Sequence, residues 1–138
     1  MRELQRILHV DDDDDIRAIA AMALELIGLF ELLQCASGKQ ATEEAASFSP
    51  DLLLLDYMMP DMDGKETLCE LRKIPGLNDV PVVFMTARVN ENLSNDLRRD
   101  GALGVIAKPF DPMDLAAQLR ALWQIYNDVE SERVMLRS

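Results

Sequence analysis

The stretch Arg6–Arg17, RILHVDDDDDIR, sets a mostly apolar run directly against five consecutive aspartates. The apolar run predicts a buried strand. An isolated carboxylate is costly to remove from water, and neighbouring carboxylates repel one another. Aspartates at the end of a buried strand are therefore either well solvated or available to bind a cation. The residues that end the other predicted strands distinguish these two possibilities.

Short apolar runs recur along the chain and alternate with longer segments of helical periodicity. They are RILHV (6–10), LLQCA (32–36), DLLLLD (51–56), PVVFMT (81–86) and GVIA (104–107). The last three are continuous rather than alternating, as in strands that are covered on both faces. Five strand-then-helix units predict a doubly wound α/β fold, with a five-stranded parallel sheet and helices on both faces.

The first and last predicted helices have identifiable ends. In the first, one apolar face is followed by a stop at Gly28, the face being Ile16, Ile19, Ala20, Ala23, Leu24 and Ile27. In the last, Asp111 is the predicted cap and Pro112 fits the first turn, and the apolar face is Leu115, Leu119, Leu122 and Tyr126. We expect both helices to pack on the sheet.

The helix predicted over Asn90 to Asp100 differs from the others. Only Leu93 and Leu97 stand at apolar helical spacing in it, so we expect it to be the least firmly docked.

Composition excludes several classes of function. The chain has 138 residues, which suits one domain, and a formal net charge of −11, which disfavours binding to nucleic acid. It has neither a signal peptide pattern nor an apolar run long enough to cross a membrane. Cys35 and Cys69 match no metal-ligand pattern, and we expect both to be reduced core residues of a cytoplasmic protein.

The predicted strands end in residues that carry chemistry. Asp11 and Asp12 follow the first strand, Asp56 ends the third, Thr86 the fourth, and Lys108 follows the fifth. In a parallel sheet these side chains meet at one rim, outside the carboxyl ends of the strands. Clustered carboxylates suit Mg²⁺, and a lysine with a hydroxyl nearby suits a phosphoryl group.

Four motifs together resemble the receiver domain of two-component response regulators. They are VDDDDDIR (10–17), PDLLLLDYMMPDMDG (50–64), FMTA (84–87) and AKPF (107–110), in the order and spacing of that family. The resemblance runs from Leu4 to Trp123 and implies the flavodoxin-like strand order 2-1-3-4-5. We therefore expect a receiver domain over residues 1–126 and a short C-terminal tail over residues 127–138.

The resemblance also implies roles for single residues. Asp56 would be the phosphoacceptor, taking a phosphoryl group from a phosphohistidine on a sensor histidine kinase or a histidine phosphotransfer protein. Asp11, Asp12 and Asp56, with the backbone carbonyl of Met58, would hold Mg²⁺ as cofactor.

Two further residues would contact the phosphoryl group. Thr86 would hydrogen-bond its oxygens and Lys108 would pair with them, and the bond between Lys108 and Pro109 would be cis. The downstream partner would be a protein, neither nucleic acid nor membrane. The chain departs from the family at Val105, where many receivers have an aromatic residue that moves on activation. Phosphorylation is unaffected by this departure, but its relay to the output surface must differ.

Simpler interpretations apply to several neighbouring residues. Asp13, Asp14 and Asp15 are expected to be solvated residues at a helix start, and His9 a packed strand residue. The methionines at positions 58, 59 and 62 fit equally well an adaptable partner surface or packing of the loop.

Other functions and origins compete with the phosphorylated receiver. One is a receiver fold that binds its partner constitutively, and another is a Mg²⁺-dependent phosphatase, which Met58 disfavours because a second aspartate is usual there. A natural single-domain regulator and a piece of a longer protein fit equally well.

Overall fold

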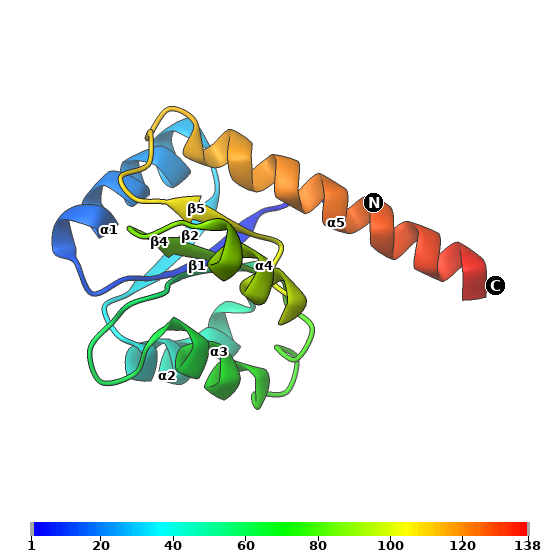
Figure 1. Ribbon diagram of the computed structural model, residues 1–138, viewed down its shortest axis with the longest axis horizontal. Coiled ribbons are helices and arrows are strands. Elements are labelled where there is room, and N and C mark those ends of the chain that lie inside the picture. The colour runs from blue at the N-terminus through cyan, green and yellow to red at the C-terminus, as the bar shows by residue number, and fades with distance from the viewer. Residues whose placement is uncertain (1, 138) are drawn as a thin grey trace.

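The structure is a computed structural model that describes residues 2–137, and its centre is a five-stranded parallel sheet (Figure 1). The strands are β1 (Arg6–Val10), β2 (Glu31–Cys35), β3 (Leu52–Asp56), β4 (Val82–Thr86) and β5 (Gly104–Ala107). Their order is β2-β1-β3-β4-β5, and every neighbouring pair is parallel. The predicted fold class and strand order are confirmed.

Helices cover both faces of the sheet. They are α1 (Asp14–Ala21), η1 (Met22–Ile27), α2 (Gly38–Phe48), α3 (Gly64–Arg72), α4 (Glu91–Arg99) and α5 (Leu115–Arg137). Figure 1 shows α1 and α5 on one side of the sheet and α2 and α3 on the other. Two apolar clusters follow from this layering. The first lies between the sheet and α1, η1 and α5, and the second lies between the sheet and α2 and α3.

The central strand β3 shows why the apolar runs are continuous. Leu52 and Leu54 pack in the first cluster, whereas Leu53 and Leu55 pack in the second. All four have no exposed surface, because successive side chains of a strand point to opposite faces.

The first helix departs from the predicted single face. Ile19 and Ile27 are 39% and 42% exposed, whereas Ala20, Ala23 and Leu24 are fully buried. Ile19 lies at the margin of the buried face. From Met22 onward the turns are wider, as the hydrogen bond from the Gly28 N–H to the Ala23 carbonyl shows, and wider turns break the 3.6-residue spacing. The predicted stop at Gly28 is confirmed.

The prediction for the cysteines is half right. Cys35 is buried at the end of β2, but Cys69 is exposed on α3. Thr67 and Leu71 occupy the buried side of α3, and Cys69 lies two residues from each, on the opposite side of the helix. Cys69 is therefore not a core residue.

The two C-terminal helices dock very differently. In α4 Leu97 is buried and Leu93 half-buried, and most other residues are exposed, as the sequence predicts for a marginally docked helix. The Asp111 carboxylate accepts the Met113 N–H and the Asp111 carbonyl accepts the Leu115 N–H at 3.1 Å, so Asp111 caps the turn that leads into α5, whose first residue is Leu115. Residues 127–137, predicted as a tail, continue α5 without a break. Within the described part of the chain, no helix is long and apolar enough to cross a membrane.

The start of α3 depends on a close backbone approach. The Gly64 N–H donates to the Tyr57 carbonyl, and a Cβ at Gly64 would lie 2.5 Å from the Asp56 carbonyl oxygen. Since the backbone cannot move aside as a flexible side chain can, we expect Gly64→Ala to lower the free energy of unfolding by about 1–3 kcal/mol. Urea denaturation measures this loss. In the control, Gly104→Ala, the new Cβ meets only the mobile end of Leu122, at 3.1 Å, so an equal loss there would contradict the explanation.

Candidate functional site

The strand register brings the predicted site residues to one rim. Val10 pairs with Leu55, so Asp11 and Asp56, the next residue of each strand, lie side by side. The same holds for β4 and β5, where Thr86 pairs with Ala107 and Lys108 follows. The Lys108 N–H donates to the Thr86 carbonyl at 2.9 Å, which fixes the start of this loop.

Lys108 joins the two buried carboxylates. Its Nζ lies 2.7 Å from Asp11 Oδ2 and 3.2 Å from Asp56 Oδ1. The Asp11 side chain has no exposed surface, that of Asp56 is 7% exposed and that of Lys108 14% exposed. The Lys108–Pro109 bond is cis, as the resemblance implies. An ammonium group shared between two carboxylates offsets much of the cost of burying them.

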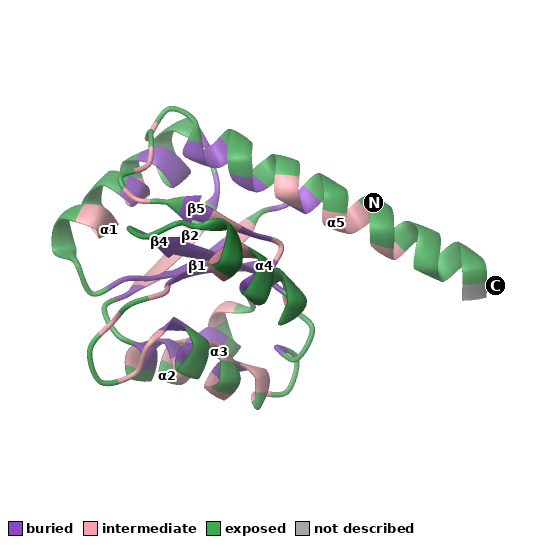
Figure 2. Cartoon of the chain, in the orientation of Figure 1, coloured by how far each residue is buried: buried purple, intermediate pink, exposed green. Residues whose placement is uncertain are grey.

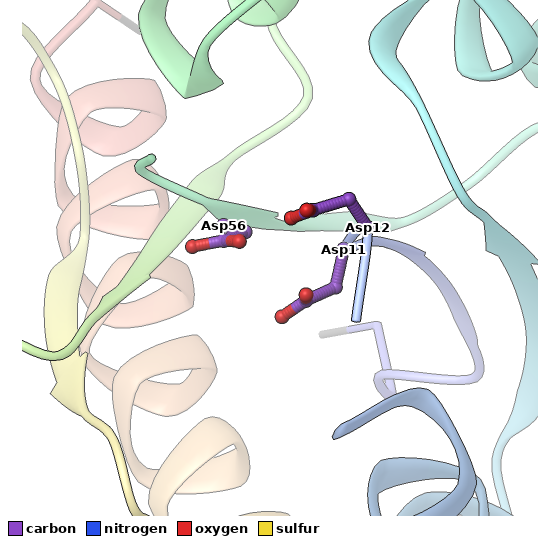
Figure 3. Close-up of side chains that lie close together, drawn as sticks. All are labelled: Asp11, Asp12 and Asp56. Carbon is purple, nitrogen blue, oxygen red and sulfur yellow. The ribbon is translucent and has the colours of Figure 1, made fainter. Parts of the chain in front are cut away.

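Three carboxylates converge beside this lysine. One oxygen from each of Asp11, Asp12 and Asp56 lies within 4.8 Å of the others, and Figure 3 shows the three side chains gathered at the strand ends. Asp12 is exposed, so the cluster is open to solvent on that side. The donor set is entirely oxygen, which fits a hard divalent cation such as Mg²⁺. The Met58 N–H donates to Asp56 Oδ1 at 3.3 Å, whereas the role of the Met58 carbonyl stays a prediction.

Thr86 stands on the other side of Asp56. Its side chain is buried, and its hydroxyl oxygen accepts the Arg88 N–H at 3.2 Å. Thr86, Asp56 and Lys108 line one pocket, together with Leu93 of α4 and Arg88. All of the predicted site residues therefore lie around one rim of the sheet.

Comparison with known proteins agrees with this arrangement. Residues 7–120 match the model of the response regulator receiver domain. The chain belongs to that family. Two curated relatives are similar over most of this receiver. The phosphate regulon transcriptional regulatory protein PhoB of Pseudomonas aeruginosa is 36% identical over 91% of the chain and 55% of its own length. The regulatory protein AtoC of Escherichia coli is 37% identical over 80% of the chain and 23% of its own length.

Solved structures of receivers share the fold. Chemotaxis protein CheY4 of Vibrio cholerae superposes with a TM-score of 0.78 at 27% identity, covering 86% of this chain and 98% of that one. A response regulator from Desulfuromonas acetoxidans gives a TM-score of 0.77 at 27% identity, with coverages of 88% and 98%. The receiver spans about half the length of PhoB, so the functions of that whole protein do not transfer to it directly.

Burial and charge shift the pKa values in this receiver's rim. Burial raises the pKa of Asp56 to about 6, the Asp11 charge adds to the rise, and Lys108 opposes it. Burial alone would lower the pKa of Lys108, but its ion pairs with Asp11 and Asp56 outweigh burial and raise it. Asp56 is therefore mainly ionised at pH 7, and Lys108 is charged.

A supporting layer that sequence reasoning missed lies behind the acidic rim. Arg17 donates from Nη1 to the Asp11 carbonyl at 2.7 Å, and Gln34 donates to the Arg17 carbonyl at 2.8 Å. The Gln34 amide also lies 3.1 Å from Nδ1 of His9, which is fully buried, with a pKa lowered to about 4 by burial. His9 is thus the packed strand residue that was predicted. A polar Gln34 inside a strand was the one sequence signal of this layer.

The other residues near the rim have structural roles. Asp13 caps α1 by accepting the N–H groups of Asp15 and Ile16, and it is exposed together with Asp14 and Asp15, as predicted. Of the three methionines, Met58 is 70% exposed. Met59 packs against the second apolar cluster, and Met62 lies against Gly38. Packing therefore holds for Met59 and Met62, whereas a partner surface at Met58 stays a prediction.

The acidic rim should cost stability at neutral pH. Because the pKa of Asp56 is higher in the folded chain than its ordinary 3.8, the native protein loses stability as pH rises from 3.8 through about 6. We expect Asp56→Asn, which carries no charge at any of these pH values, to be more stable by about 1–3 kcal/mol at pH 8. Denaturation in EDTA at several pH values should show this gain shrink toward zero near pH 4. Asp12→Asn, at an exposed position, is the control, and a gain as large there would contradict the role of burial.

Proposed function

We propose that this receiver accepts a phosphoryl group on Asp56 from a phosphohistidine of a sensor histidine kinase or a phosphotransfer protein, in a Mg²⁺-dependent reaction. The observation that carries the proposal is the Lys108 ammonium group bridging Asp11 and Asp56 beside a third carboxylate. The modified receiver then signals to a protein partner. A net charge of −11 argues against nucleic acid as the partner of this domain.

The reaction joins an Asp56 oxygen to phosphorus and breaks the bond between phosphorus and the imidazole nitrogen of the donor. A carboxylate ionised at pH 7 is ready to attack. Lys108 is already within ion-pair distance of Asp56, so its charge offsets the charge that the phosphoryl oxygens bring. The acyl phosphate is labile to water, so the signal decays by itself, without a second enzyme.

The cation has a suitable place in this rim. Asp11, Asp12 and Asp56, with the Met58 carbonyl, would hold Mg²⁺, which neutralises phosphoryl oxygens when it is bound. The Arg17 side chain donates a hydrogen bond to the backbone carbonyl of Asp11, which fixes the position of Asp11.

Incubation with acetyl phosphate and Mg²⁺ should add one phosphoryl group to the native chain, as intact mass spectrometry measures it. Asp56→Asn should add none, because the amide is not nucleophilic, and omission of Mg²⁺ should reduce the gain at least about tenfold. Asp61→Asn is the matched control. It removes an exposed carboxylate from the same loop at a residue with φ of 66°, which asparagine tolerates, and it should behave like the native chain.

Two results would contradict the proposal. A phosphoryl group on Asp56→Asn would place the acceptor elsewhere. No gain with either acetyl phosphate or a phosphohistidine donor would leave constitutive binding as the function of this fold.

The switch should operate through the loop after Thr86. If the Thr86 hydroxyl turns toward a phosphoryl group on Asp56, it gives up the Arg88 N–H, and that loop leads directly into α4. Helix α4 is weakly docked, which suits a movable element. Val105 is half-buried and β-branched, so no aromatic ring can flip at that position.

Beryllofluoride, a phosphoryl mimic, should change amide exchange in residues 87–100. The change should be several-fold, because a helix with one buried residue is held by little free energy. Thr86→Ala should lose most of this change while still binding the mimic. Unchanged exchange in the native chain would rule out this relay.

A further inference from the structure

Each polar atom of Asp11 lies next to a partner. Its N–H donates to the Cys35 carbonyl of β2 at 3.1 Å, and its own carbonyl accepts from Arg17 Nη1 at 2.7 Å. Its Oδ1 accepts the Asp13 N–H at 3.0 Å, and its Oδ2 lies 2.7 Å from Lys108 Nζ. The backbone and the side chain of this buried residue are therefore both fixed in direction.

One of these partners, Arg17, is itself held from β2. Gln34 Nε2 donates to the Arg17 carbonyl at 2.8 Å and lies 3.1 Å from His9 Nδ1. A carbonyl can only accept, so the amide presents its nitrogen here, and the His9 nitrogen beside it must accept as well. His9 pairs with Gln34 in the sheet, and Figure 2 shows its strand β1 as mainly buried. Gln34 thus ties the start of α1 to two neighbouring strands.

The Arg17 guanidinium group connects this tie to the acidic rim. Its Nη1 donates to the Asp11 carbonyl, and its Nη2 pairs with the exposed carboxylate of Asp14. The Arg17 side chain is only 20% exposed, so most of it lies against the protein. Its donors therefore stay aimed at the strand end from which Asp11 and Asp12 enter the carboxylate cluster.

From these contacts we infer that Gln34 and Arg17 are positioning residues for Mg²⁺, which set the affinity of the acidic rim for the cation by fixing the direction of Asp11. This inference rests on the proposed function. Neither side chain is one of the predicted ligands. Groups that hold a metal ligand in place typically contribute about 10–100-fold to metal affinity, because the ligand then loses little freedom when the cation binds.

The charge of Arg17 acts in the opposite direction. A guanidinium group beside Asp11 repels a divalent cation, so the removal of its charge alone would tighten Mg²⁺ binding. The loss of its hydrogen bond to Asp11 would weaken Mg²⁺ binding. The sign of the change therefore separates the two effects. Gln34 is neutral, so its replacement tests positioning with no change of charge.

Isothermal titration calorimetry of the full chain with MgCl₂ measures the affinity without a phosphoryl donor. Gln34→Leu and Arg17→Met should each raise the Kd for Mg²⁺ about tenfold. Arg17→Lys keeps a donor for the Asp11 carbonyl and should restore most of the native affinity. Gln40→Leu is the matched control. Gln40 is half-buried like Gln34, but its Oε1 accepts the Ala36 N–H at 2.8 Å, so this change should leave the Kd as it is.

The Mg²⁺ dependence of phosphorylation gives a second measurement. With acetyl phosphate, Gln34→Leu should need about tenfold more Mg²⁺ for half of its maximal rate and should still reach the native maximal rate. A variant with a damaged fold would lose maximal rate instead.

The outcomes distinguish this inference from the proposed function. A lower Kd for Arg17→Met, an unchanged Kd for Gln34→Leu, or an equal rise for Gln40→Leu would each overturn the inference and leave the proposed function in place. A native chain that binds no Mg²⁺ would overturn both.

Discussion

The bridge from Lys108 to Asp11 and Asp56 is the interaction on which the site of this receiver depends. Two buried carboxylates side by side repel each other, and burial adds to the cost of their charge. The ammonium group of Lys108 reaches both at 2.7 and 3.2 Å and offsets much of that repulsion. The raised pKa of Asp56 shows that the balance is incomplete. The site is therefore held under electrostatic strain that a cation or a phosphoryl group can change.

The sheet makes this arrangement possible because its interior does not depend on the rim. The four leucines of β3 are fully buried, two in each apolar cluster, and fix the register without help from polar groups. That register sets Asp11 beside Asp56, and Thr86 near Lys108, whatever the charges cost. The apolar layers stabilise the fold, and the strand ends carry the groups of the proposed reaction.

The two C-terminal helices are attached to the domain in different ways. Helix α4 is docked mainly by Leu97 and follows the loop that Thr86 holds, so it suits a change within one molecule. Helix α5 is anchored in the core by Leu115 and Leu119, and its outer half continues the same helix without a break.

The sequence by itself determined the parallel sheet, the strand order through its resemblance, and the residues at the strand ends. Those features follow from local patterns, such as continuous apolar runs and the acids that end them, which a linear reading preserves. Only the tertiary structure decided that Lys108 bridges two carboxylates, that Arg17 and Gln34 support the rim, and that Cys69 faces solvent. The wider turns after Met22 and the helical residues 127–137 also needed it. Such features depend on distances between side chains far apart in the sequence and on how far each turn rotates, and a pattern of residue types does not contain either quantity.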